Sequence, residues 1–317
     1  MNDKKQELRA LIQKYEAKQH RQMGVAILVG TAILALAVLL APKPAAEEAM
    51  VAVAEAPAPD INAYEGVALI GKAAVVYDLA TGEVLFERNA KAQLPLASLT
   101  KLLTVYAAAT SLPRDSKVTV TGEALLADGE SGFSAGETFQ FDDLARLALV
   151  SSSNDATEAI ALAAENKRAQ SGPNLLASAA AAIGLSQTYA LNGTGLDESG
   201  SVSGGYGSAT DVAKLAGALL KVAPEIARAS TQTSITIYSD AGVAHTLPNT
   251  NPDVVRVPNI LLSKTGFTDL AGGNLVVVYD AGIGHPVAIA VLGSTREGRF
   301  VDVETLLART SRHFAGI

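Results

Sequence analysis

Two β-rich segments lie far apart in the chain, and the chain between them has a mostly helical pattern. Residues 71–90, "GKAAVVYDLATGEVLFERNA", predict two strands around the turn "LATG", and residues 274–294, "NLVVVYDAGIGHPVAIAVLGS", repeat this logic around "DAGIGHP". The intervening pattern favours helices over 98–111, 142–150, 154–166, 173–184 and 210–222, and 298–314 favours a terminal helix. Asp142 or Asp143 is expected to cap the second of these helices.

Strands at both ends with helices between them predict that the two ends meet in one sheet. We therefore expect an α+β domain rather than an alternating parallel one. Its antiparallel sheet combines the N- and C-terminal strands and is flanked by helices, and a mostly helical lobe is inserted between them. With 317 residues, 49% of them hydrophobic, the chain can bury a sizeable core.

Charge and residue usage exclude several classes of function. The net charge is −7, and no basic stripe follows the N-terminus, so nucleic acid is not expected as a partner. The chain has no cysteine, which excludes a thiol nucleophile, a zinc–thiolate site and disulfides. Its four histidines lack metal-ligand spacing, and "GVALIGKA" has Ala73 where a phosphate loop needs Ser or Thr. No metal or other cofactor is expected.

The N-terminus predicts attachment to a membrane. Residues 24–41, "GVAILVGTAILALAVLLA", carry no charge and are long enough for a transmembrane signal-anchor. Six basic and three acidic side chains precede them, so residues 1–23 are expected to be a cytoplasmic leader. Residues 42–62 form a Pro-, Ala- and Glu-rich linker, and 63–317 form the extracytoplasmic domain of a single-pass protein of the cell membrane. The alternative is a cleaved signal peptide and a secreted domain.

A serine and a lysine stand three residues apart in "PLASLTKLL", at the start of the predicted helix 98–111. Ser98 and Lys101 share one helix face at this spacing, so both can point into one cleft. A serine hydroxyl is a weak nucleophile that needs a neighbouring base. A lysine serves as that base only if burial or a nearby cation lowers its pKa from about 10.4. Taken alone, the pair favours a capping serine and a solvated lysine over a catalytic pair.

Two further motifs strengthen the catalytic interpretation. Ser152-Ser153-Asn154 falls between two predicted helices, where its alternative role is to cap the second helix. Lys264-Thr265-Gly266 opens a predicted strand, where its alternative role is a lysine guarding a sheet edge. In the order S-x-x-K, S-x-N and K-T-G, the three motifs are typical of penicillin-binding proteins and β-lactamases.

From about Lys72 onward the chain resembles the serine-type D-Ala-D-Ala carboxypeptidases, the low-molecular-mass penicillin-binding proteins. The similarity covers about four-fifths of the chain and includes "AAVVYDLATGEVLFERNAKAQLPLASLTKLLT", "LVSSSNDA", "NGTGLDESG", "SATDVAKLA" and "KTGFTDLAGGNLV". It implies the fold shared by β-lactamases and DD-peptidases. One departure is Leu262, which stands where the family usually has glycine and could shift the edge of the substrate-binding strand.

The resemblance implies a carboxypeptidase that removes the terminal D-Ala from peptidoglycan stem peptides and is a β-lactam target. Ser98 would form the acyl-enzyme, Lys101 would accept its proton, Ser152 would protonate the leaving group, and Asn154 would bind the substrate amide. The substrate-binding set would be Lys264 and Thr265 for the carboxylate, Gly266 for close approach of the substrate backbone, and the backbone N–H of Phe267 with that of Ser98 as oxyanion hole.

Three other functions remain open. A D,D-endopeptidase that cuts peptidoglycan cross-links would use the same residues. A membrane-tethered sensor would be acylated by a β-lactam or muropeptide without turnover, although no cytoplasmic effector domain is evident. A class A β-lactamase is disfavoured, because Ser153 replaces the aspartate of its middle motif and no convincing deacylating glutamate is found. The sequence leaves the oligomeric state and the third residue of the stem peptide undetermined.

Overall fold

The computed structural model of the protein describes residues 63–129 and 132–316, together with Lys14, Lys18 and Thr31. The predicted transmembrane segment 24–41 and linker 42–62 therefore lie outside the described residues, apart from Thr31. Within the described residues, no helix has both the length and the apolar character needed to cross a membrane.

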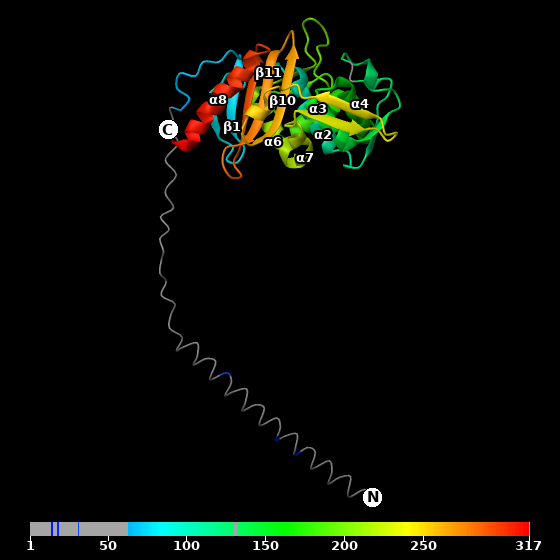
Figure 1. The fold of residues 1–317 in the computed structure, drawn as a ribbon, viewed down its shortest axis with the longest axis horizontal. Coiled ribbons are helices and arrows are strands. Elements are labelled where there is room, and N and C mark those ends of the chain that lie inside the picture. The colour runs from blue at the N-terminus through cyan, green and yellow to red at the C-terminus, as the bar shows by residue number, and fades with distance from the viewer. Residues whose placement is uncertain (1–13, 15–17, 19–30, 32–62, 130–131, 317) are drawn as a thin grey trace. The chain divides into compact units, whose positions relative to one another are not determined.

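The two β-rich segments pair as the sequence predicts. A five-stranded antiparallel sheet has the order β10-β11-β12-β1-β2 (Figure 1). Its strands are β1 (Ala73–Asp78), β2 (Val84–Arg88), β10 (Ile260–Thr268), β11 (Gly272–Asp280) and β12 (Pro286–Ser294). The pairing of β1 with β12 joins the two ends of the domain, with Ala73 opposite Leu292. The expected α+β sheet is confirmed, and β10 forms one of its edges.

Both faces of this sheet are covered, which explains why its strands read as continuous apolar runs. In β1, Ala73 and Val75 face one hydrophobic core, whereas Ala74 and Val76 face another. Helix α6 (Ala209–Val222) packs on the first face, and α8 (Gly298–Ala315) packs on the second, as Figure 1 shows for α8. The sheet is thus held between a terminal helix and the inserted helical lobe.

The helical lobe lies beside the β10 edge of the sheet (Figure 1). Its helices are α2 (Thr100–Ala109), α3 (Phe141–Val150), α4 (Asn154–Arg168), α5 (Gly172–Ala182) and the short α7 (Pro224–Ala229), of which only α7 was not predicted. Three small antiparallel sheets complete it: β3 (Leu94–Pro95) with β7 (Gly205–Gly207) and β6 (Tyr189–Ala190), β4 (Lys117–Thr119) with β5 (Thr138–Gln140), and β8 (Ser234–Tyr238) with β9 (Ala244–Pro248).

The predicted cap of α3 is wrong. Its N-cap residue is Gln140, with no side-chain cap, and both aspartates lie in the first turn of the helix. The helix begins at Phe141, which is fully buried and donates its backbone N–H to Ser116 O at 2.8 Å. Asp142 instead pairs with Arg114, with 2.7 Å between Oδ1 and Nε. Burial of an aromatic side chain therefore fixes this helix start, and the carboxylates favour the positive end of the helix dipole.

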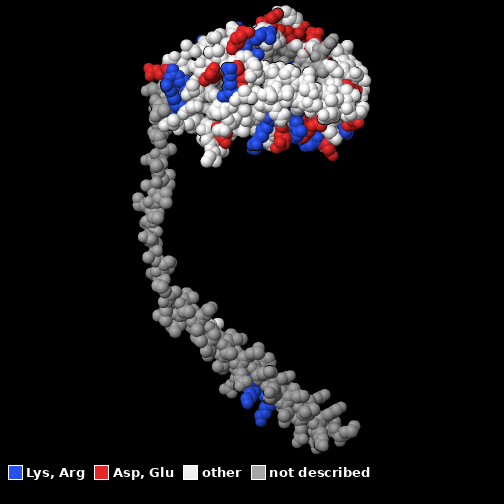
Figure 2. All heavy atoms as spheres, in the orientation of Figure 1, with Lys and Arg blue, Asp and Glu red and all other residues white. Residues whose placement is uncertain are grey.

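Charged side chains on the face shown in Figure 2 form small groups of mixed sign with broad uncharged areas between them. This face has no continuous basic surface of the kind that follows a nucleic-acid backbone.

Candidate active site

Ser98 lies in a short turn that directly precedes α2. Strand β3 ends at Pro95, and the 3₁₀ turn η1 (Ala97–Leu99) follows. Ala97 has φ of +48°, a left-handed conformation that is unusual for alanine and turns the chain sharply. The N–H of Leu96 donates to Gly205 O at 2.9 Å and so holds the entry to this turn. Ser98 itself is half-buried.

Lys101 lies in the first turn of α2 and directs its amine toward Ser98. The distance from Lys101 Nζ to Ser98 Oγ is 2.9 Å, and Nζ also donates to Thr194 O at 2.7 Å. The lysine is fully buried, and the loss of solvation lowers its pKa to about 7, although the nearby Glu158 carboxylate acts in the opposite direction. A large fraction of Lys101 is therefore neutral near pH 7 and able to accept a proton.

The second motif forms the turn between α3 and α4. Ser152 has φ of +61°, and Ser153 caps α4, because its Oγ accepts the N–H of Ala156 at 3.1 Å. The cap is therefore provided by the middle residue, which leaves Ser152 and Asn154 for other roles. Asn154 Nδ2 donates to the carbonyl of Asp128, whereas Asn154 Oδ1 is buried without a hydrogen-bond partner among the described residues. A buried amide oxygen of this kind can accept a hydrogen bond from a ligand.

The third motif lies inside β10, which begins four residues earlier than the sequence predicts. Lys264 is 1% exposed, and its Nζ donates to Ser152 Oγ at 2.8 Å and to Thr265 O at 2.9 Å. Burial lowers the pKa of Lys264 well below its usual value, and the positive charges of Lys101 and Arg299 lower it further. The contact between Lys264 and Ser152 brings the second and third motifs together.

Gly266 allows β10 to lie directly against the turn that carries Ser98. A Cβ at Gly266 would lie 2.8 Å from Leu96 O and 3.3 Å from Leu99 N. The space beside this glycine is therefore filled by the chain around Ser98, so any larger residue would push the two motifs apart. The backbone at Phe267 follows immediately, close to the same turn.

Leu262 lies in β10, two residues before Lys264. It is fully buried in the core between the sheet and the helical lobe. The register with β11 shifts between Ile260 and Leu262, and from Leu262 to Thr268 the pairing is continuous. The irregularity thus ends before Lys264, which pairs with Val276.

Three residues that are not in the predicted site set also contact the motifs or the segment just before Ser98. Thr250 Oγ1 lies 2.7 Å from Thr265 Oγ1. Asn274, on β11, is fully buried and donates to Pro95 O and Leu96 O, each at 3.0 Å, just before the serine turn. Arg299, on α8, donates to Gly266 O at 2.7 Å, and its burial lowers its pKa to about 10. All three residues lie outside the three motifs, and only the fold shows which atoms of the site they contact.

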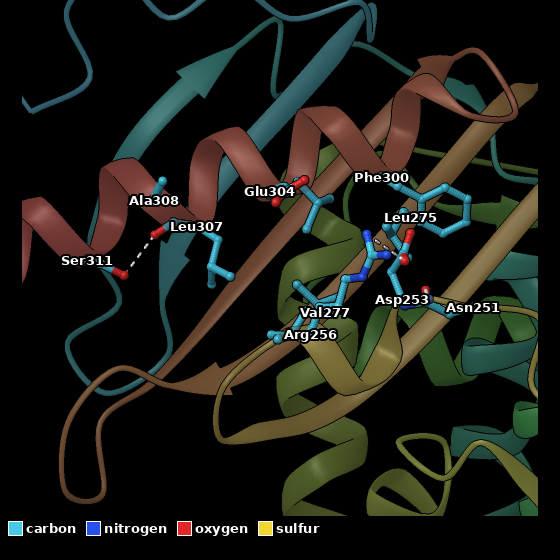
Figure 3. Close-up of a pocket in the computed structure, with 12 residues that line it drawn as sticks. Asn251, Asp253, Arg256, Leu275, Val277, Phe300, Glu304, Leu307, Ala308 and Ser311 are labelled. Atoms are coloured by element: carbon cyan, nitrogen blue, oxygen red, sulfur yellow. Dashed lines mark hydrogen bonds and ion pairs between the residues drawn. The ribbon is translucent and has the colours of Figure 1, made fainter.

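A separate cavity of about 190 Å³ lies on the α8 face of the sheet, between α8 and η3 (Val254–Arg256), as Figure 3 shows. Leu275, Val277 and Phe300 are among the apolar side chains that line it. None of the predicted site residues lines this cavity, so it is distinct from the Ser98 site.

The geometry around Ser98 suits acyl transfer. It combines the hydroxyl of a half-buried serine, a buried amine of lowered pKa beside it, and a second buried lysine that can bind a carboxylate. A serine and a lysine can together provide the nucleophile and the base of such a reaction.

Comparison with known proteins agrees with this geometry. Residues 57–296 match the peptidase S11 family, whose description is D-alanyl-D-alanine carboxypeptidase. The chain belongs to this family. It is 30% identical over 274 residues to the D-alanyl-D-alanine carboxypeptidase DacC of Escherichia coli, which covers 82% of this chain and 63% of DacC. It is also 30% identical over 218 residues to a D-alanyl-D-alanine endopeptidase of Pseudomonas aeruginosa, covering 66% of this chain and 67% of the relative.

Solved structures of S11 relatives have the same fold. A D-alanyl-D-alanine carboxypeptidase from Mycobacterium tuberculosis matches with a TM-score of 0.68 and 25% identity, over 77% of this chain and 92% of that one. Penicillin-binding protein D2 of Listeria monocytogenes, solved in a cefotaxime-bound form, matches with a TM-score of 0.64 and 28% identity, over 77% and 98% of the two chains. The predicted family and its α+β fold are confirmed. The chain spans about three-fifths of the length of the curated carboxypeptidases that it matches.

Proposed function

We propose that this S11 protein is a serine D-Ala-D-Ala carboxypeptidase that removes the terminal D-Ala from peptidoglycan stem peptides. The observation that carries the proposal is the 2.9 Å contact between Ser98 Oγ and the fully buried amine of Lys101, whose pKa is lowered to about 7. This arrangement supplies a nucleophile and a base without a metal or another cofactor.

The reaction would proceed through an acyl-enzyme. Ser98 Oγ attacks the carbonyl carbon of the penultimate D-Ala while Lys101 accepts the hydroxyl proton. The C–N bond to the terminal D-Ala then breaks, and the leaving amine takes a proton through Ser152, which contacts Lys264 at 2.8 Å. Water attacks the ester, gives up a proton, and restores the Ser98 hydroxyl. The products are the shortened peptide and free D-Ala.

The remaining motif residues would bind the substrate. Lys264 and Thr265 form charge-assisted hydrogen bonds with the terminal carboxylate. The free Oδ1 of Asn154 accepts the amide N–H of the peptide. The backbone N–H groups of Ser98 and Phe267 stabilise the oxyanion, and loss of one such donor costs roughly two to three orders of magnitude in rate. A β-lactam would acylate Ser98 in the same way, as the cefotaxime-bound Listeria relative supports.

The test uses the full chain with purified muropeptides, a mixture of pentapeptide monomers and cross-linked dimers, and follows products by mass spectrometry. Loss of one alanine from the monomers is the expected result, and the Ser98→Ala variant should not produce it. Cleavage of dimers with intact pentapeptides would instead support a D,D-endopeptidase, the function of the Pseudomonas relative. If neither substrate changes but a fluorescent penicillin labels Ser98 stably, the enzyme proposal fails in favour of a sensor.

We also propose that residues 24–41 anchor the protein in the cell membrane, with 1–23 in the cytoplasm and the domain 63–317 outside, joined by the linker 42–62. The uncharged run of 18 residues and the basic residues before it support this topology. Because the chain has no cysteine, the single-cysteine variants Ala10→Cys and Ala45→Cys can be labelled separately in whole cells. A membrane-impermeant maleimide should reach position 45 but not position 10. A shortened mature chain in the medium would instead indicate a cleaved signal and secretion.

A further inference from the structure

The peptide bond between Thr194 and Gly195 is held at both of its ends. Its carbonyl accepts the amine of Lys101 at 2.7 Å, and its N–H donates to Asn192 Oδ1 at 2.7 Å. A peptide unit is planar, with its C=O and N–H pointing in opposite directions, so fixing the N–H also fixes the carbonyl. Asn192 therefore controls where this carbonyl points.

Asn192 is itself firmly placed. Its Oδ1 also accepts from Thr194 Oγ1 at 3.1 Å, and its Nδ2 donates to Leu196 O at 3.0 Å and to Glu198 Oε1 at 2.6 Å. Its backbone N–H donates to Gly204 O at 3.2 Å. The amide orientation is unambiguous, because each atom meets only partners of the matching kind.

The loop also packs closely against its neighbours on both sides of the peptide. Gly195 has φ of +76°, and a Cβ there would lie 2.0 Å from Ala97 O. The adjacent carbonyl, Gly193 O, accepts from Thr104 Oγ1 at 2.7 Å. The loop is thus pressed against the serine turn and against α2, and Thr194 is 3% exposed.

The Thr194 carbonyl has a defined effect on a neutral lysine. A neutral amine has two N–H donors and one lone pair. If one N–H is committed to Thr194 O, rotation about the terminal C–N bond is restricted, and the lone pair can be aimed at the Ser98 hydroxyl. The same carbonyl also favours the ammonium form, because a charge-assisted hydrogen bond is stronger than a neutral one.

We infer that Asn192 is a positioning residue for proton transfer from Ser98 to Lys101, acting through the Thr194–Gly195 peptide. This inference rests on the proposed function. Among the described residues, the charged groups that interact electrostatically with Lys101 are Glu158, on α4, and Lys264, on β10, whereas the side chain of Asn192 bonds to Thr194, Gly195, Leu196 and Glu198. Replacing Asn192 therefore changes the carbonyl while leaving those two charges in place.

The test measures the second-order rate constant for acylation by a fluorescent penicillin between pH 5.5 and 9.5, using the full chain. The wild-type rate should rise with pH, with a midpoint near the Lys101 pKa of about 7. In Asn192→Ala the plateau should fall tenfold or more, because the lone pair is no longer aimed. The midpoint should move to lower pH, because the ammonium loses a hydrogen-bond acceptor. Because Asn192 Nδ2 donates to Glu198 Oε1, the aspartate is tested together with Glu198→Gln, which supplies a donor opposite its second oxygen. The double variant Asn192→Asp/Glu198→Gln retains an acceptor oxygen for the Gly195 N–H, so its plateau should stay within about threefold, with a midpoint no lower than that of the wild type.

Asn89→Ala is the matched control. Asn89 is another asparagine, at a left-handed backbone position, and its Nδ2 donates to Lys72 O at 2.8 Å. This hydrogen bond does not involve any residue of the site. Its pH profile should equal that of the wild type, and thermal melting reports the folded fraction of every variant. A fall in plateau without a midpoint shift, or with a shift to higher pH, overturns the inference, because it indicates fewer folded molecules or a wetter site.

If Asn192→Ala does not fold, the double variant Asn192→Asp/Glu198→Gln decides alone: a retained plateau supports the inference, and a tenfold loss overturns it. If the wild-type chain is labelled and Asn192→Ala has the same pH profile as the wild type, the inference about Asn192 is overturned but the proposed function is not. A wild-type chain that takes up no label overturns the proposed function and this inference with it.

Discussion

The helical side and the sheet side of the site each bury a lysine beside a serine, yet the two lysines have different surroundings. Lys101, on α2, contacts Ser98 and feels the negative charge of Glu158, which favours its ammonium form. Lys264, on β10, contacts Ser152 and lies near the positive charges of Lys101 and Arg299, which disfavour its ammonium form. Burial lowers both pKa values, and in the part of the chain that the structure describes a carboxylate opposes the shift at Lys101 but not at Lys264.

This difference indicates a division of roles. Lys101 has a pKa of about 7 and can exchange a proton with Ser98 during turnover. Lys264 lies among cations, so an arriving carboxylate would stabilise its charged form strongly. The helical side is therefore suited to proton transfer, and the sheet side to anion binding. Four predictions test this contrast.

Lys101→Met should have the largest effect. Acylation by a penicillin should fall by roughly 10³ to 10⁴, because general-base catalysis is lost. The remaining rate should no longer rise with pH near 7, and stopped-flow fluorescence with intact-protein mass spectrometry measures both. A tenfold loss that keeps the wild-type pH profile would assign the base to another residue.

The same variant should be more stable than the wild type at low pH. The unfolded lysine titrates near 10.5 and the folded one near 7, so below pH 7 the folded state bears the full cost of the buried charge. This cost disappears as pH rises from 7 to 10.5. Urea unfolding should show Lys101→Met stabilised by up to roughly 5 kcal/mol at pH 6, with the difference shrinking toward pH 10. A difference independent of pH would mean that the lysine is not buried as a charge.

Lys264→Met should have a smaller and more selective effect. Loss of a charge-assisted hydrogen bond costs roughly 1.5 to 3 kcal/mol, so acylation by compounds with a free carboxylate should slow about 10- to 100-fold. The corresponding methyl esters should already react slowly with the wild type and lose little more in the variant. Equal losses for acids and esters would contradict anion binding by the sheet side.

Glu158→Gln should have the smallest effect. The Glu158 carboxylate raises the Lys101 pKa, so its removal should shift the pH profile of acylation to lower pH by less than one unit. The plateau should change little, and at pH 6 the variant should be slightly faster than the wild type. Glu165→Gln is the control, because Glu165 raises the pKa of Glu158 but is not among the groups that shift Lys101. A shift to higher pH in Glu158→Gln would reverse the assigned sign.

Local features of this protein were determined by the sequence. The three-residue spacing of Ser98 and Lys101 already places both on one face, as their 2.9 Å contact shows. The five strands of the main sheet and six of the helices α2 to α8 followed from the sequence pattern, and the order of the three motifs identified the family. The cap of α3 was wrong, because burial of Phe141 outweighed the capping preference of aspartate.

Only the tertiary structure decided the chemistry of the site. Lys264 meets Ser152 across 112 positions of sequence, and Lys101 meets Thr194 across 93. The roles of Asn192, Asn274 and Arg299 depend on such contacts. A lysine's pKa depends on how much water the fold removes and which charges it brings near, and these are sums over residues far apart in the chain. The sequence thus identified the candidate reacting residues, and the fold determined the pKa values of their lysines.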